Sequence, residues 1–485
     1  MELKVLFVSP EVVPFAKSGG LADVAGSLPP ALKRLGVDVR IVMPFYRSVK
    51  EGDFKSTVVK EKLATPIGKQ MINARVRETR TFEDVPVYFL ESEELFDRPN
   101  LYGSYVGDYY DNLERFTLLS RGALELALDL NFIPDIVHCH DWQTGIIPAL
   151  LKGPYISETE FAHTSTIFTI HNMGYQGNFP KEKLTATGLP VAEFFHPEGL
   201  EYWGDISLLK SGIVYGDVVT TVSPTYAQEI QTPEYGMGME GVLKKRNDVL
   251  FGILNGIDYN VWNPERDKHI IMSYNNKKKS GKKKCKEALI REMKLETAIK
   301  GKPLLGIISR LDSQKGFDIL LSIIDKIIAM DTGLVLLGSG DPVMERELKE
   351  AVNKYKGKIG IGTGFNDPLA HRIMAGADLF LIPSRYEPCG LTQMYALKYG
   401  TVPIVRATGG LNDTINDFDG ENGNGFKFHG YEPSSLLKAI EKAVTLFQDK
   451  TTWKKLMSNG MKEDFSWEKS ATKYLELYES MKRKK

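Results

Sequence analysis

The alternation of apolar and polar positions divides the first half of the chain into short strands and amphipathic helices. An apolar strand from Leu3 to Val8 precedes a helix ending near Leu35, and a second strand covers Val37 to Met43. Further strands are expected at 136–139 and 167–170, each ending in a polar or glycine-rich loop. This order predicts a parallel sheet with right-handed crossovers.

The second half repeats this pattern. The apolar residues between 317 and 327 are spaced for one face of a helix. Strands are predicted at Leu304–Ser309, Leu334–Leu337, Ile359–Gly362, Leu379–Pro383 and Pro403–Val405.

We therefore predict an α/β protein with two doubly wound, Rossmann-like domains, at 1–245 and 265–465. A chain of 485 residues exceeds the size at which one hydrophobic core keeps growing. Residues 246–264 are rich in turn-forming residues and are expected to connect the domains. The segment 466–485 is predicted to form one or two closing helices, and periodicity does not indicate which domain they pack on.

Composition excludes several classes of partner. Lys plus Arg and Asp plus Glu both number 62, so net charge favours neither nucleic acid nor an anionic membrane. The three cysteines lack a Cys-x-x-Cys spacing, which argues against a disulfide scaffold or a structural zinc site. No apolar run approaches ~20 residues and no leader pattern is seen, so we expect a cytoplasmic protein, or a plastid one if a transit peptide has been removed. Seven lysines at 277–286 are expected to form a solvated surface loop rather than a polyanion site.

The first candidate site is the segment Lys17 to Val24, Lys-Ser-Gly-Gly-Leu-Ala-Asp-Val, between a strand and a helix. Gly19 and Gly20 let the backbone approach a ligand at a helix N-terminus, which favours an anion, and Lys17 adds positive charge. The lysine precedes the glycines, so the segment is neither a P-loop nor a dinucleotide fingerprint. The alternative is a βα turn that uses glycine only for its tight path.

Two more strands end in polar residues. One is followed by His140, Asp141 and Trp142, and the next by His171, Asn172, Tyr175, Gln176 and Gly177. Ligands of open parallel sheets bind beyond the carboxyl ends of strands, so these residues are predicted to form a polar crevice floor. A metal site is discounted because His138 and His140 are expected to point to opposite faces of their strand.

In the second half, Arg310 and Lys315 follow a strand directly and are suited to a phosphate. The alternative is a pair of surface cations balanced by Asp312. A separate segment at 335–341 begins like a dinucleotide fingerprint, but Val343 stands where its third glycine should fall. The sequence evidence for NAD binding is therefore weak.

The most specific segment runs from Pro383 to Gln393. Because Pro388 restricts the residue before it to extended geometry, Glu387 is predicted to stay outside the helix that starts near Gly390. The amides of 390–392 then form a free helix N-terminus beside a carboxylate, a pairing that suits a sugar joined to a phosphate. Cys389 is interpreted as a small buried contact, since no histidine partner for a nucleophile is recognisable.

Taken in order, these motifs resemble the bacterial glycogen synthases and plant starch synthases over nearly the whole chain. The other matching segments are Asn255-Gly256-Ile257-Asp258 and His371 to Asp378. The resemblance implies the GT-B architecture, in which two Rossmann-like domains face each other across a cleft and the C-terminal helix returns to the first. It also implies transfer of glucose from ADP-glucose to the non-reducing end of an α-1,4-glucan, with retention of configuration.

The resemblance also implies roles for individual residues, with Phe365 in place of an aromatic residue, often tyrosine, that stacks on adenine, and Ser18 in place of a common threonine. The catalytic set is Glu387, His171, Arg310 and Lys315; the donor-binding set is Lys17, Gly19, Gly20, Asp23, Asn255, Phe365, Cys389, Gly390, Leu391 and Thr392; the acceptor-binding set is Asp141, Trp142, Asn172 and Tyr175.

We expect no cofactor, neither a metal nor pyridoxal phosphate, because Lys17, Arg310 and Lys315 already supply positive charge. The expected partners are ADP-glucose and the glucan, with no nucleic acid and no membrane. The competing hypotheses are a GT-B enzyme that uses another nucleotide sugar, a pyridoxal-phosphate-dependent phosphorylase, and a non-catalytic glucan-binding protein.

Overall fold

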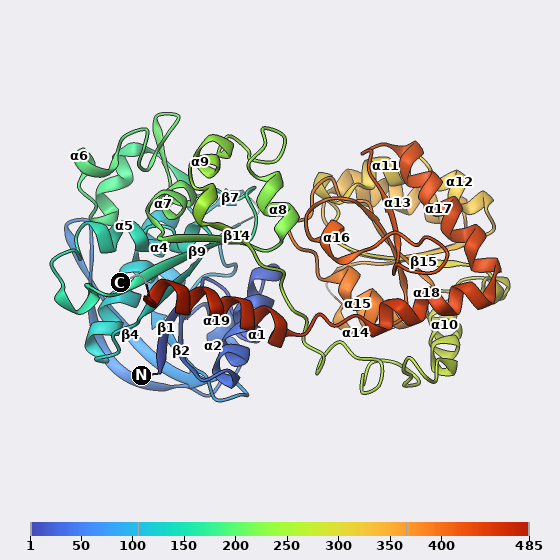
Figure 1. The fold of residues 1–485 in the computed structure, drawn as a ribbon, viewed down its shortest axis with the longest axis horizontal. Coiled ribbons are helices and arrows are strands. Elements are labelled where there is room, and N and C mark those ends of the chain that lie inside the picture. The colour runs from blue at the N-terminus through green and yellow to red at the C-terminus, as the bar shows by residue number, and fades with distance from the viewer. Residues whose placement is uncertain (1, 105, 365, 484–485) are drawn as a thin grey trace. The chain divides into compact units, whose positions relative to one another are not determined.

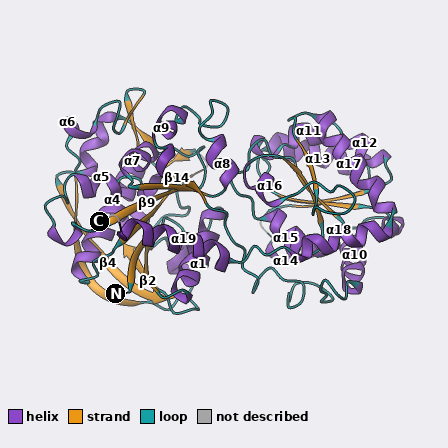
Figure 2. Ribbon diagram, in the orientation of Figure 1, coloured by secondary structure: helices purple, strands orange, loops and turns teal. Residues whose placement is uncertain are grey.

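The computed structural model describes residues 2–104, 106–364 and 366–483, which fold into two compact units (Figures 1 and 2). The first unit contains Met1–Gly256 together with Trp467–Lys485, and the second contains Ile257–Ser466. No helix in the described ranges is long and apolar enough to cross a membrane.

The first unit is built on a nine-stranded sheet in the order β14-β13-β9-β8-β1-β2-β5-β4-β3. Neighbours from β14 to β5 are parallel, and β4 is antiparallel to both β5 and β3. The predicted strands of this half are confirmed, and the antiparallel edge is an addition. The strands are β14 (Leu250–Gly252), β13 (Val218–Thr221), β9 (Ser165–Ile170), β8 (Ile136–His140), β1 (Leu3–Val8), β2 (Val37–Pro44), β5 (Pro86–Glu91), β4 (Gln70–Arg80) and β3 (Thr57–Ile67).

Helices surround this sheet. A small antiparallel sheet has the order β10 (Asn178–Phe179), β12 (Asp205–Ser207), β11 (Glu201–Tyr202), and a second one pairs β6 (Gly103–Ser104) with β7 (Gly107–Asp108). The helices are α1 (Gly20–Arg34), α2 (Arg47–Glu51), α3 (Glu93–Phe96), α4 (Asn112–Asp129), α5 (Ile147–Lys152), α6 (Val191–Phe194), α7 (Leu208–Tyr215), α8 (Pro224–Glu229), α9 (Glu240–Lys245) and α19 (Trp467–Arg483).

The last helix, α19, packs beside α1 in the first unit, although 432 residues separate them in the sequence (Figure 1). Its Tyr474 and Tyr478 are fully buried. The hydroxyl of Tyr478 lies 2.7 Å from Nδ1 of His138 on β8, so the helix is joined to the centre of the sheet by a polar contact as well as by packing.

The second unit has a six-stranded, wholly parallel sheet in the order β17-β16-β15-β18-β19-β20. Its five predicted strands are confirmed. The strands are β17 (Ile359–Gly362), β16 (Gly333–Leu337), β15 (Leu304–Ile308), β18 (Leu379–Ile382), β19 (Val402–Arg406) and β20 (Phe426–Phe428); the helices are α10 (Ser280–Glu292), α11 (Phe317–Leu321), α12 (Ile324–Ala329), α13 (Pro342–Lys354), α14 (Asp367–Gly376), α15 (Thr392–Lys398), α16 (Gly409–Thr414), α17 (Pro433–Gln448) and α18 (Lys450–Lys462).

The single helix predicted over 317–327 is wrong, because the segment forms α11 and α12. Between them the amide of Ile323 donates to the carbonyl of Leu320, a tighter i to i−3 turn that interrupts the α-helix. The apolar side chains on both sides of this turn remain buried in one core, which is why their spacing suggested one helix face.

The surface loop predicted for the lysine-rich segment is correct only for its first part, where Lys277 and Lys278 are exposed and lie outside any helix. From Ser280 onward it forms α10, and Lys282 and Lys286 are both only 6% exposed. The Nζ of Lys286 lies 2.6 Å from Oδ2 of Asp378, and the Nζ of Lys282 donates to Oγ1 of Thr401 at 2.6 Å. Each buried ammonium therefore has the polar partners that a low-dielectric site demands.

Candidate functional site

The glycine-rich loop of the first unit connects β1 to α1, as the sequence predicted. The Nζ of Lys17 lies 2.7 Å from Oδ1 of Asp23, in the first turn of α1. Both side chains are partly exposed, so this ion pair leaves the ammonium accessible to an incoming anion.

A residue that sequence reasoning missed, Glu11, shapes this loop. Its carboxylate is 3% exposed and accepts hydrogen bonds from the amide and hydroxyl of Ser18 and from the amide of Gly19. The hydroxyl of Tyr102 donates to the same carboxylate at 2.5 Å. The amide of Gly19, which the sequence predicted to face an anion, is thus engaged by Glu11, and Lys17 supplies the positive charge of the loop. An acidic residue just beyond the end of β1 was the available signal.

The interpretation that His138 and His140 point to opposite faces is wrong. Residues two apart on a strand share a face, and the two imidazole rings lie with centroids 4.1 Å apart. The rings do not converge on a metal, because His138 already contacts Tyr478 through Nδ1 and Oγ1 of Thr169 through Nε2.

His171 follows β9, and its Nε2 lies 3.0 Å from Nδ1 of His140. Burial lowers the pKa of His138 and of His171 to about 3, and that of His140 well below its usual value. His171 is therefore neutral at physiological pH and is suited to exchange hydrogen bonds with a sugar hydroxyl.

Asp141 has a left-handed backbone, with φ of 56°, immediately after β8. Its Oδ1 accepts the amide of His171 at 2.7 Å, which joins the ends of two neighbouring strands. Burial raises the pKa of this carboxyl to about 7. A strained backbone and a perturbed carboxyl at one strand end are features of functional sites.

The remaining residues predicted for the first unit differ in exposure. Tyr175 is 51% exposed, and Asn172 is half-buried with its Oδ1 accepting the amide of Gly174. Trp142 is only 8% exposed and packs edge-on against Phe116. The Oδ1 of buried Asn255 has no hydrogen-bond partner within the described ranges, so this amide oxygen can still accept a donor from a ligand.

In the second unit, the structure brings together two residues that are 72 positions apart in the sequence. The Nζ of Lys315 lies 2.7 Å from Oε2 of Glu387, and the two side chains are 18% and 12% exposed. The hydroxyl of Ser384 donates to the same oxygen at 2.9 Å. Lys315 follows β15 and Glu387 follows the neighbouring strand β18, so both lie at the carboxyl edge of the sheet.

Glycines make this approach possible. Gly316 has φ of +75°, and a Cβ there would lie 2.1 Å from the carbonyl oxygen of Pro383. Gly409, with φ of +44°, lies against the carbonyl of Glu387 in the same way, and the amide of Gly410 donates to that carbonyl. Only glycine fits at 316 and 409 without strain. Gly409 and Gly410 were not singled out in the sequence, although their adjacency after a strand was a usable signal.

Arg310 also follows β15, and its guanidinium lies 3.4 Å from Oδ2 of Asp312. This is the pairing expected if Arg310 is a surface cation balanced by Asp312. Its side chain is 56% exposed. Cys389 is buried, and Gly390, Leu391 and Thr392 are half-buried at the start of α15, which begins at Thr392 rather than near Gly390. Phe365 lies outside the described residues.

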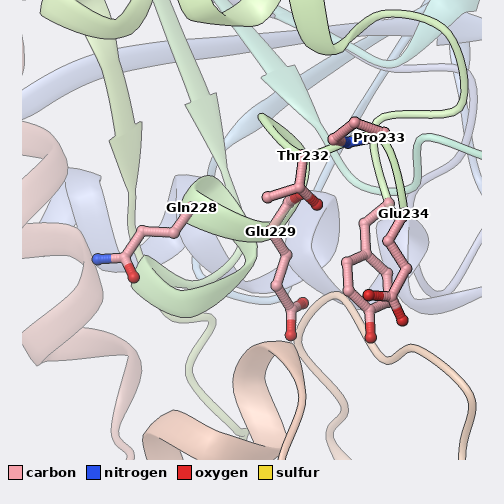
Figure 3. Close-up of a pocket in the computed structure, with 6 residues that line it drawn as sticks. Gln228, Glu229, Thr232, Pro233 and Glu234 are labelled. Atoms are coloured by element: carbon pink, nitrogen blue, oxygen red, sulfur yellow. The ribbon is translucent and has the colours of Figure 1, made fainter.

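A hollow of about 480 Å³ opens elsewhere, at the end of α8 and the loop that follows (Figure 3). Its lining contains two glutamates, Glu229 and Glu234, and no predicted site residue. An acidic lining is unsuited to an anionic ligand, so the strand ends described above remain the candidate site.

Two α/β units, whose sheets are largely or wholly parallel and carry cationic and carboxylate groups at their carboxyl edges, fit the GT-B class of glycosyltransferases. Comparison with known families agrees, because residues 4–245 match the starch synthase catalytic domain and residues 290–456 match the glycosyl transferases group 1. The chain belongs to the glycogen synthase family, which includes the plant starch synthases.

Individual relatives cover the full chain. The glycogen synthase of Geotalea daltonii is 47% identical over 485 residues, all of both chains, and that of Geotalea uraniireducens is 45% identical over 98% of each. Among solved structures, the catalytic domain of starch synthase IV from Arabidopsis thaliana, bound to ADP and acarbose, is 34% identical, with a TM-score of 0.91 over all of both chains. The chain is therefore a glycosyltransferase with glycogen or starch synthase function.

Proposed function

We propose that the chain transfers glucose from ADP-glucose to the non-reducing end of an α-1,4-glucan, with retention of configuration. The Lys315–Glu387 pair carries this proposal. A carboxylate that accepts sugar hydroxyls lies beside an ammonium that attracts phosphate, as a nucleotide sugar requires. The related starch synthase IV bound to ADP supports an adenine nucleotide.

In this proposal Lys315 and Arg310 stabilise the negative charge that develops on the departing diphosphate more strongly than the charge of the bound donor. The amides of Gly390, Leu391 and Thr392 hold the distal phosphate, while Glu387 and neutral His171 flank the transferred glucose. Lys17 and Asp23, on their loop, and Asn255 contribute to the donor side.

The acceptor glucan is assigned to residues beyond β8 and β9. Asp141 accepts glucan hydroxyls, and the exposed ring of Tyr175 offers an apolar face to a sugar. Asn172 supplies amide hydrogen bonds, and buried Trp142 packs against Phe116 and Phe179 next to Asp141. The acceptor hydroxyl then attacks from the face that ADP leaves, which retains the configuration without the pair of closely spaced carboxylates that a double-displacement glycosidase uses.

The decisive experiment measures incorporation of labelled glucose into glycogen from ADP-glucose and, separately, from UDP-glucose. We expect a kcat/KM at least tenfold higher for ADP-glucose. Equal or reversed values would move the assignment to another nucleotide sugar, and no incorporation from either would favour a glucan-binding protein. The stereochemistry of the new linkage, read by NMR, checks retention.

We further propose that the chemistry needs neither a metal ion nor pyridoxal phosphate. Lys17, Arg310 and Lys315 supply the positive charge that a metal would otherwise provide. We expect glucose transfer to persist after exhaustive chelation. Activity that vanished on chelation and returned with a divalent ion would contradict this, and a pyridoxal absorbance band would indicate a phosphorylase.

A further inference from the structure

Three potential metal ligands, none of which is assigned to the candidate site, gather in the second unit. His269 lies in the segment before α10, and Asp367 and His371 lie one turn apart on α14. One ligand atom from each lies within 4.8 Å of the others, and Oδ2 of Asp367 is 3.8 Å from Nε2 of His371. Residues at i and i+4 on a helix share one face, a spacing that suits a common ion.

The polar environment of His371 is incomplete in one respect. The ring is 1% exposed, and its Nδ1 lies 2.8 Å from Oδ2 of Asp267, a carboxylate that also accepts the hydroxyl of Tyr399 at 2.6 Å. Asp267 has no proton to donate when ionised, so Nδ1 carries the hydrogen, and in the neutral ring Nε2 presents a lone pair. Within the described ranges Nε2 has no hydrogen-bond partner. A buried acceptor of this kind is costly unless a ligand satisfies it.

The ring is also held in place. The indole of Trp262 stacks on His371 with centroids 3.8 Å apart and an interplanar angle of 6°, and Tyr395 stacks with the same indole at 4.0 Å and 8°. A histidine whose second nitrogen donates to a carboxylate, and whose plane is fixed by packing, has the arrangement of a metal-ligating imidazole.

We propose that His269, Asp367 and His371 bind a divalent transition metal ion, with Zn²⁺ as the best match. Two imidazoles and a carboxylate suit Zn²⁺, whereas Ca²⁺ and Mg²⁺ prefer oxygen ligands alone. Three protein ligands leave a fourth position for water. Zinc bonds of about 2.0–2.2 Å bring ligand atoms to roughly 3.4 Å of one another, so closure needs shifts of about 1 Å. Asp367 is exposed and His269 is half-buried, so both side chains have room to move.

The ion serves stability rather than glucose transfer. It joins the segment that carries Asp267 and His269 to α14, 98 residues later, and satisfies the buried nitrogen of His371. Since a ligand that binds only the folded state raises stability by mass action, the thermal midpoint rises with free Zn²⁺.

The test titrates the metal-stripped full chain with Zn²⁺ in competition with a chromophoric chelator. We expect one Zn²⁺ per chain, with affinity at least ~10-fold weaker in Asp367→Asn and in His269→Ala. His429→Ala, which removes an exposed histidine of the same unit, is the matched control and keeps wild-type affinity. Unchanged affinity in both ligand variants, or no binding at micromolar Zn²⁺, overturns the proposal.

Two further measurements distinguish loss of the site from misfolding of the variants and from an ion bound elsewhere. Asp367 is exposed and His269 is half-buried, so without metal the thermal midpoints of Asp367→Asn and His269→Ala should match that of the wild type. Adding Zn²⁺ should raise only the midpoints of the wild type and His429→Ala. With Co²⁺ as probe, the visible absorption bands of a four-coordinate site should appear in the wild type and vanish in Asp367→Asn. Equal Zn²⁺-induced shifts in all variants would place the ion elsewhere and contradict the assignment.

Discussion

At the scale of single residues, the ionisable groups at the strand ends are set by what each side chain touches. Lys315 faces Glu387, Lys17 faces Asp23, and Glu11 holds the backbone of the glycine loop. The sequence correctly predicted that Lys17, Lys315 and Glu387 follow the ends of strands, and it missed Glu11. It could not predict the pairing of Lys315 with Glu387, because that contact depends on two neighbouring strands and on the tight approach at Gly316.

The variant Lys315→Ala tests the role of the Lys315 ammonium in glucose transfer. Loss of this ammonium should lower kcat with ADP-glucose by roughly 10²–10³, because charge on the departing diphosphate is no longer stabilised. Stability should change far less, since Ser384 still donates to Glu387. Lys354→Ala, which breaks an exposed ion pair with Asp325, is the matched control and should leave kcat unchanged. Unaltered kinetics in Lys315→Ala would remove its proposed role.

The second residue-scale prediction concerns Glu11→Gln, which keeps the side chain's shape but removes its charge. The amide and hydroxyl donors of the loop lose a charged acceptor, a change worth about 1.5–3 kcal/mol. We expect KM for ADP-glucose to rise about tenfold or more as the loop becomes less ordered, with a smaller change in KM for glycogen. Glu83→Gln, at an exposed ion pair with Arg34, should leave both values unchanged. A KM for ADP-glucose equal to that of the wild type would show that Glu11 does not position the loop.

At the scale of elements, periodicity predicted where most helices and strands lie but not how some of them are used. The lysine-rich segment was misinterpreted because composition reports average polarity, whereas α10 turns Lys282 and Lys286 towards buried partners on distant segments. Similarly, the strand carrying His138 and His140 buries both rings on one face, where Tyr478 of α19 completes the network.

The element-scale prediction follows from the buried pair in α10. Lys286→Met removes the ammonium that pairs with the largely buried Asp378, whose Oδ2 keeps only the neutral amide of Leu304 among its observed donors, and should lower the free energy of unfolding by about 3 kcal/mol. Lys284→Met, on the exposed side of the same helix, should change it by less than about 1 kcal/mol. Urea unfolding of the purified variants measures both values, and equal effects would contradict the role of Lys286.

At the scale of the whole molecule, the response of stability to acid should depend on the buried histidines. Burial lowers the pKa of His138 to about 3, below its unfolded value of about 6.5. The unfolded chain then binds more protons than the folded one between these values, so stability falls as pH drops through this window. Each such histidine contributes about 1.4 kcal/mol per pH unit there, while Asp141, with its pKa raised to about 7, acts in the opposite direction.

Variants measure the contribution of His138 to this pH dependence separately from those of the other histidines. Between pH 4.5 and 6.5, the slope of the free energy of unfolding against pH should be smaller in His138→Gln than in the wild type. The difference should approach about 1.4 kcal/mol per pH unit, which corresponds to one proton. His163→Gln, at an exposed position, should keep the wild-type slope. Equal slopes in all three proteins would mean that His138 titrates normally in the folded state.

The sequence by itself determined the parallel strands of both α/β sheets and which residues follow them, because hydrophobic periodicity and turn chemistry act over a few neighbouring positions. Only the tertiary structure decided which of these residues meet: Lys315 with Glu387, His140 with His171, Glu11 with the glycine loop, and His371 with Asp267 and Asp367. These contacts join positions up to 104 residues apart. Their partners and burial depend on strand order and on the close approach of loops, which local patterns do not encode.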